Sequence, residues 1–208
     1  MRRRLGLATA IAIVMIALAV PIAAQAGFLQ HWSGESAYAS FDSQSGDVRT
    51  TVWLEAQKGK QQSPPGNGQA FSRVYLWIYS WDVPSGDVLF RGWGMDDLGP
   101  KDFTVGNGLK TASLNADITV TQWIYPGPVP ASFTVGVDAD WLGNGKAARS
   151  KSIYHFIYDG ERFMDSESSV QKSASATGAF TVGGMGTINL STENAMLASG
   201  KQRTTAVY

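Results

Sequence analysis

Residues 132–141, with the sequence SFTVGVDADW, decide the fold class of this chain. Apolar and polar residues alternate along the whole stretch, and successive side chains of a β-strand point to opposite faces of its sheet. One face would carry Phe133, Val135, Val137, Ala139 and Trp141, and the other Ser132, Thr134, Gly136, Asp138 and Asp140. The stretch therefore predicts a half-buried strand.

The same period of two recurs on both sides of this stretch. Residues 48–56 and 111–120 alternate in the same way, whereas residues 71–83 and 153–158 are apolar on both faces and predict central strands. Turn sequences rich in Gly, Pro, Asn and Asp separate the runs. The length fits one domain, and we predict an all-β protein with a single antiparallel β-sandwich.

Three segments are less regular. Residues 59–69 contain Pro64, Pro65 and no large apolar run, which predicts an exposed loop. Residues 166–176 are rich in Ser and Ala, which fits either a long edge strand or a weakly ordered stretch, and we favour the strand. Residues 193–198 are the candidate for a helical turn in the part of the chain that follows the N-terminal segment.

The first 26 residues have the parts of a secretory signal peptide. Arg2, Arg3 and Arg4 precede an apolar run at 5–20, and Ala24 and Ala26 supply the small residues before a cleavage site. We therefore expect a signal peptide at 1–26, a mature domain at 27–208, and a secreted or periplasmic location. No second apolar run approaches about 18 residues, so no membrane span is expected after signal removal.

Charge and cysteine content narrow the classes of partner. The chain has 17 Lys and Arg against 17 Asp and Glu, and cleavage after Ala26 would remove three arginines and leave a net charge near −3. Nucleic acids and anionic membranes attract concentrated positive charge, so neither is an expected partner. The chain contains no cysteine, so stability must come from burial and strand pairing.

Several runs of the mature chain resemble a group of uncharacterised secreted bacterial β-proteins. The resemblance is carried by residues 107–120, 133–141 and 148–156, together with the D-x-x-S-G-D-V loops at 42–48 and 82–88. It extends over most of the mature chain. It implies export and one β-domain, and it implies no activity.

Catalytic and metal-binding patterns are sparse. His31 and His155 lie in no catalytic motif, and His155 falls inside an apolar run, where a structural histidine is expected. The paired carboxylates Asp96–Asp97 and Asp138/Asp140 are compatible with a small hydrolase, which remains an alternative function. A solvated strand face explains the second pair better. No cofactor is expected; the alternative is a loose calcium site at Asp138, Asp140 and Asn144.

Aromatic residues carry most of the functional information. The seven tryptophans suit a core that lacks disulfides, but the phase of residues 48–56 places Trp53 on the outward face, between Thr51 and Glu55. Exposed rings on a rigid sheet can bind sugars. We therefore predict a non-catalytic binding module for carbohydrate or another extracellular polymer, with Trp53, Trp123 and Tyr125 as its site. The alternatives are the hydrolase and an eight-stranded outer-membrane barrel.

Overall fold

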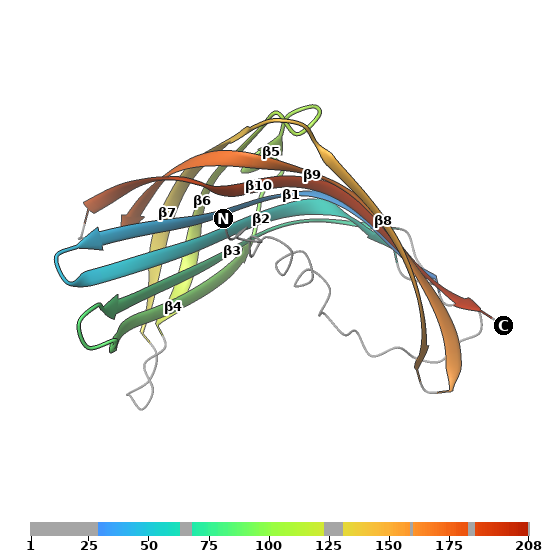
Figure 1. The fold of residues 1–208 in the computed structure, drawn as a ribbon, viewed down its shortest axis with the longest axis horizontal. Helices are drawn as coiled ribbons and strands as arrows, with labels where there is room; N and C mark the ends of the chain where they lie inside the picture. Colours follow the sequence, from blue (N-terminus) through green and yellow to red (C-terminus); the bar gives the residue numbers. More distant parts are fainter. Residues whose placement is uncertain (1–28, 63–67, 123–130, 159, 183–185, 208) are drawn as a thin grey trace, which may run out of the picture.

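The computed structural model describes residues 29–62, 68–122, 131–158, 160–182 and 186–207. Within these ranges the regular structure is all β-strand (Figure 1). The strands are β1 (Leu29–Ser45), β2 (Val48–Gln62), β3 (Gln69–Asp82), β4 (Val88–Asp97), β5 (Phe103–Val105), β6 (Thr111–Gln122), β7 (Ser132–Gly143), β8 (Ala148–Tyr158), β9 (Glu161–Val182) and β10 (Gly186–Val207). The predicted signal peptide at 1–26 lies outside the described residues. None of the described segments forms a helix long and apolar enough to cross a membrane.

All strands belong to one antiparallel sheet with a sandwich-like form, as the sequence predicts. The hydrogen-bonded order is β10-β1-β2-β3-β4-β6-β7-β9-β8, and β9 also pairs with β10. In Figure 1, β1–β4 run across the front of the molecule and β6 and β7 pass behind them at a steep angle. The two layers are thus parts of one continuous sheet that turns back on itself.

The core lies between these two layers. Phe41, Leu54 and Leu76 come from the front layer, and their side chains are fully buried. Phe41 packs edge-on against Phe180 of β9, with ring centroids 5.4 Å apart. The indole of Trp141 on β7 donates a hydrogen bond of 2.9 Å to the backbone carbonyl of Tyr38 on β1. Apolar burial and this bond together connect the layers.

The predicted alternation is confirmed in the strands that form the core. In β7, Val135, Val137, Ala139 and Trp141 are buried, while Thr134, Asp138 and Asp140 are exposed. The same alternation holds for residues 52–56 of β2 and 112–120 of β6. The strand predicted at 71–83 is central, with β2 and β4 on its two sides.

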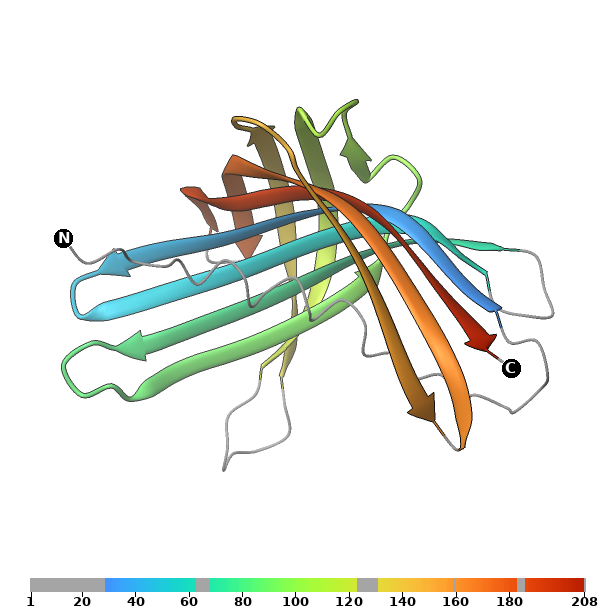
Figure 2. The ribbon, with the colours of Figure 1, turned by 45° about the vertical axis from the view of Figure 1, so that its right-hand side comes forward.

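Part of the sheet extends beyond the second layer. We call this part the arm and define it as β8 with residues 161–171 of β9 and 199–207 of β10. Figure 2 shows the arm running away from the crossed strands toward the lower right. Only residues 174–182 of β9 pair with β7, whereas residues 161–171 pair with β8.

The arm overturns two predictions of strand position. Residues 153–158 are not a central strand but part of the edge strand β8, where Ile157 is 70% exposed and His155 is exposed too. Conversely, the predicted edge strand at 166–176 lies inside the sheet, between β10 on one side and β8 and β7 on the other. The alternation of apolar and polar residues predicts which side chains share a face of the sheet. It does not predict which other strands lie next to a given strand.

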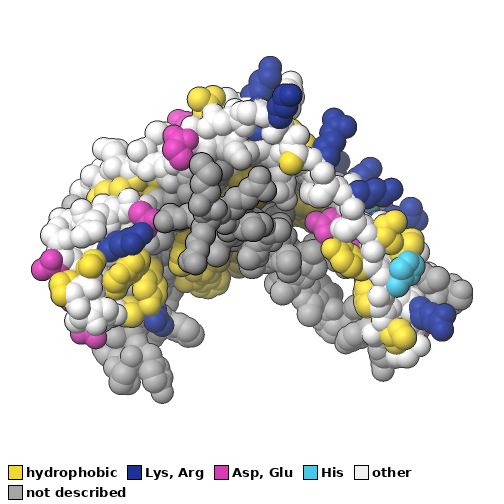
Figure 3. Space-filling model, in the orientation of Figure 1, with side chains coloured by type: hydrophobic (Ala, Val, Ile, Leu, Met, Phe, Trp, Pro, Cys, Tyr) yellow, Lys and Arg dark blue, Asp and Glu magenta, His cyan; other side chains and the backbone are white. Residues whose placement is uncertain are grey.

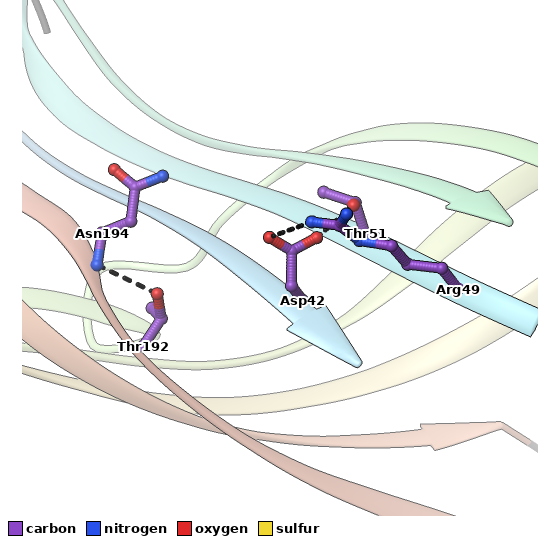
Figure 4. A network of polar contacts seen from close by, with 5 residues as sticks. All are labelled: Asp42, Arg49, Thr51, Thr192 and Asn194. Carbon is purple, nitrogen blue, oxygen red and sulfur yellow. Dashed lines mark hydrogen bonds and ion pairs between the residues drawn. The ribbon is translucent and has the colours of Figure 1, made fainter. Parts of the chain in front are cut away.

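The helical turn predicted at 193–198 is also wrong. This segment is part of β10, and its register against β9 shifts between Thr192 and Ala195. The backbone N–H of Asn194 donates to the Thr192 hydroxyl at 2.9 Å inside this irregularity (Figure 4). The bulge returns Ala195 and Leu197 to the buried face.

Candidate aromatic binding surface

Three tryptophans lie directly across from one another on adjacent strands. Trp53 of β2 pairs with Trp77 of β3, and Trp77 pairs with Trp93 of β4. Their neighbours along each strand, such as Leu54, Leu76 and Gly94, are buried. Because side chains alternate between faces, the three indoles share the outer face of the front layer. We call Trp53, Trp77 and Trp93 the aromatic platform.

The platform is accessible at its two ends. Trp53 is 40% exposed and Trp93 is 47% exposed, whereas Trp77 between them is half-buried. Tyr75 stacks on Trp77, with ring centroids 5.8 Å apart and planes within 11° of parallel. Trp53 and Trp93 take part in none of the ring pairs found among the described residues. Their ring faces are therefore the ones available to a ligand.

Cationic side chains border the platform on one side. Arg91 lies 4.9 Å from the ring centre of Tyr79 and donates a hydrogen bond of 2.8 Å to the Tyr79 hydroxyl. Arg49 lies 5.5 Å from the ring centre of Trp81. These contacts are cation–π interactions that hold the guanidinium groups close to the sheet. Figure 3 shows exposed apolar side chains over the left-hand part of the molecule, where β2–β4 lie.

Asp42 fixes the position of one of these arginines. Its carboxylate lies 3.3 Å from the Arg49 guanidinium and also accepts a hydrogen bond from the Thr51 hydroxyl (Figure 4). All three residues lie on the outer face of the β1–β2 hairpin, and Arg49 pairs across strands with Trp81. The polar groups at this border are therefore preorganised beside the rings.

A carboxyl group borders the platform on the other side. Glu55 lies two residues from Trp53 and pairs with Tyr38 on β1 and with Tyr75 on β3. Burial among these neighbours raises the pKa of the Glu55 carboxyl above its ordinary value. Burial also raises the pKa of Tyr38. The platform thus has hydrogen-bonding groups next to its apolar rings, which is the composition that sugar sites need.

The structure describes one of the three site residues that the sequence predicts. Trp53 lies on the exposed face that its phase predicts, whereas Trp123 and Tyr125 lie outside the described residues. The sequence pattern does not single out Trp77 and Trp93 as site residues. They lie opposite each other because the register of β3 against β4 shifts between Ser80 and Trp81, and no local signal in the sequence predicts that shift.

The two predicted carboxylate pairs lie in different surroundings. Asp97 accepts a hydrogen bond of 2.8 Å from the Arg73 guanidinium, while Asp96 accepts one of 2.6 Å from the backbone N–H of Thr119. As neighbours on β4 they point to opposite faces. Asp138 and Asp140 share the exposed face of β7, as predicted.

The predicted calcium ligands lie in and just after β7, and the two histidines lie in other strands. Asn144 follows β7, and its backbone N–H donates to the Ser173 carbonyl at 2.6 Å. Across the described ranges, no group of three His, Cys, Asp or Glu side chains is close enough to hold a metal ion. His31 pairs with Arg203, and His155 pairs with Met164, so the two histidines lie in different rows of the sheet.

The chain matches no protein-family model, no curated protein and no solved structure. The geometry of the platform is therefore the main guide to function.

Proposed function

We propose that the chain is an exported, non-catalytic binding module whose aromatic platform holds a carbohydrate. The observation that carries the proposal is the row formed by Trp53, Trp77 and Trp93, two of which are substantially exposed. Sugar rings have apolar C–H faces that pack on indole, and their hydroxyls need polar neighbours such as Glu55. The signal-peptide pattern at 1–26 supports action in the periplasm or outside the cell.

A polymer fits the platform better than a small sugar does. The indoles lie on adjacent strands about 4.8 Å apart, so the row extends about 10 Å from β2 to β4. One ring contributes on the order of 1 kcal/mol, which gives only a weak contact. Several rings acting together are required for useful affinity, and a chain of sugars can cover them at once.

The proposal predicts that replacing the platform rings weakens binding to insoluble glycans. Trp53→Ala and Trp93→Ala should each lower retention by about fivefold, because each removes roughly 1 kcal/mol of stacking. Retention is measured by pull-down on a panel that includes cellulose, chitin and xylan, after circular dichroism shows that every variant is folded. Tyr154→Ala on β8 is the matched control, since Tyr154 is an exposed aromatic residue far from the row.

Two outcomes would contradict the proposal. One is that the wild-type protein binds none of the glycans. The other is that the two tryptophan variants are retained as well as the Tyr154→Ala control.

A further inference from the structure

A concave surface crosses the sheet where the arm begins. It is a groove of about 1160 Å³ that spans six strands, in the order β8, β9, β10, β1, β2, β3. Its floor is one row of paired residues: Ser150, Ser169, Gly200, Gly34, Gly59 and Phe71. The rows before and after this one form its two walls. With strands about 4.8 Å apart, the groove is about 24 Å long.

Glycine makes the floor of the groove possible. A Cβ atom on Gly34 would lie 2.5 Å from the Lys58 carbonyl, and one on Gly59 would collide with the Ser33 carbonyl. The strands therefore approach each other here in a way that a side chain would prevent. Trp32 and Phe71 stack with ring centroids 6.5 Å apart, and alternation places both rings on the opposite face from the walls.

The walls of the groove carry most of its charge. One wall includes Arg149 and Lys58; the other alternates lysine and serine, in the order Lys151, Ser168, Lys201, Ser33, Lys60. Figure 3 shows Lys and Arg side chains gathered along the upper right of the molecule, over the arm. Lysines two strands apart along this wall are separated by about 10 Å.

The positive charge of the groove is mostly uncompensated. Of the described residues that line it, Glu35 is the one acidic residue, and it pairs with Lys58 at 3.5 Å. Arg149, Lys151, Lys60 and Lys201 are exposed and form no ion pair with any residue in the described ranges. A charge excess of this kind in a groove attracts anions, although the chain as a whole has no net charge.

We propose that this groove binds an anionic polysaccharide, whose sugars carry carboxylates or sulfates. The spacing of the lysines lets them contact the charged groups of alternate sugars along such a polymer, and the serines between them can hydrogen-bond to hydroxyls. A single-stranded nucleic acid is less suited because such sites stack bases on exposed aromatic rings. Phe71 is the one aromatic residue in the described lining of the groove, and its ring stacks on Trp32. This site is separate from the aromatic platform and does not depend on it.

The test measures binding of the full chain to alginate, dextran sulfate, uncharged dextran and single-stranded DNA. The groove variant is Lys151→Gln/Lys201→Gln, and the control is Lys110→Gln/Lys146→Gln, which removes the same charge at two exposed lysines that do not line the groove. At low salt we expect the groove variant to bind alginate or dextran sulfate about tenfold more weakly than wild type. Its affinity should also fall less steeply with salt, because fewer counterions are released.

The result also separates the two proposals. Trp53→Ala should leave binding to the anionic polymers unchanged, whatever its effect on neutral glycans. Equal binding to dextran and alginate, equal loss in the groove and control variants, or tighter binding to DNA than to both polyanions would each overturn the proposal.

Discussion

Val135 illustrates how much a single position in this chain is constrained. Its side chain is 0% exposed, in the middle of β7, and it faces the front layer across the core. Thr134, the next residue, is exposed on the same face as Asp138 and Asp140. A carboxylate at the first position would be buried without a partner, whereas one at the second would stay in water.

We therefore expect Val135→Asp to unfold the protein or prevent its accumulation, and Thr134→Asp to leave it folded. The first substitution costs several kcal/mol, against a total stability of about 5 to 15 kcal/mol. Chemical denaturation of both variants beside wild type provides the measurement. Equal damage from the two substitutions would show that β7 is buried on both faces.

Glu55 couples the stability of the fold to pH. Its pKa is raised by burial from an ordinary value of 4.5, so the folded state binds the proton more tightly than the unfolded state does. The carboxyl group favours folding most when protonated, and this contribution is lost as pH rises through the raised pKa. The charged form of this carboxyl group is thus less favourable in the folded state, beside Trp53, than in water.

Glu55→Gln should remove this pH dependence. Between pH 4 and pH 7 the melting temperature of the variant should fall less than that of wild type, and at pH 7 the variant should be at least as stable. Glu161→Gln is the control, because Glu161 is exposed in the arm. Differential scanning calorimetry across this range gives the comparison, and parallel curves for wild type and Glu55→Gln would contradict the expected desolvation.

At the scale of elements, the hairpins follow from local chemistry. The repeated D-x-x-S-G-D-V loops form the β1–β2 and β3–β4 turns, and Gly46 and Gly86 have positive φ in both. In the second turn, Asp82 accepts hydrogen bonds from the Ser85 hydroxyl at 2.6 Å and from its backbone N–H at 2.9 Å, which lowers the Asp82 pKa. In the first turn the equivalent Asp42 instead binds Arg49. The two similar loop sequences therefore both form turns, but their first aspartates have different partners.

The parts of the fold that the sequence could not predict depend on distant pairing. Alternation correctly identified the buried faces of β2, β6 and β7, and it placed Trp53 outward. It could not show that β9 is long enough to pair with both β7 and β8, because that depends on where three separate segments meet. The same limit applies to the groove, whose lysines come from β2, β8 and β10 and share no local motif.

At the scale of the whole molecule, buried apolar residues are distributed unevenly over the sheet. The crossed layers contain nearly all of the buried apolar residues. Among the arm side chains whose burial the structure describes, the one that is buried is Phe163, which stacks on Phe156 with ring centroids 5.3 Å apart. Segments with little buried apolar surface open at a lower free energy than the global unfolding transition. The groove lies where the well-packed part meets the arm.

We therefore expect native-state hydrogen exchange to divide the chain into two units. Amides of 148–158 in β8 should exchange faster than those of 132–143 in β7, although both strands are hydrogen-bonded to β9. Saturating alginate should slow exchange in residues 148–158 and 160–171. A ligand that bridges β8 and β2 across the groove binds only when the arm is folded against the rest of the sheet, and so it stabilises that state. Uncharged dextran serves as the control. Equal protection of β7 and β8 in the free protein would mean that the arm is as stable as the crossed layers. The difference in packing between them would then have no energetic consequence.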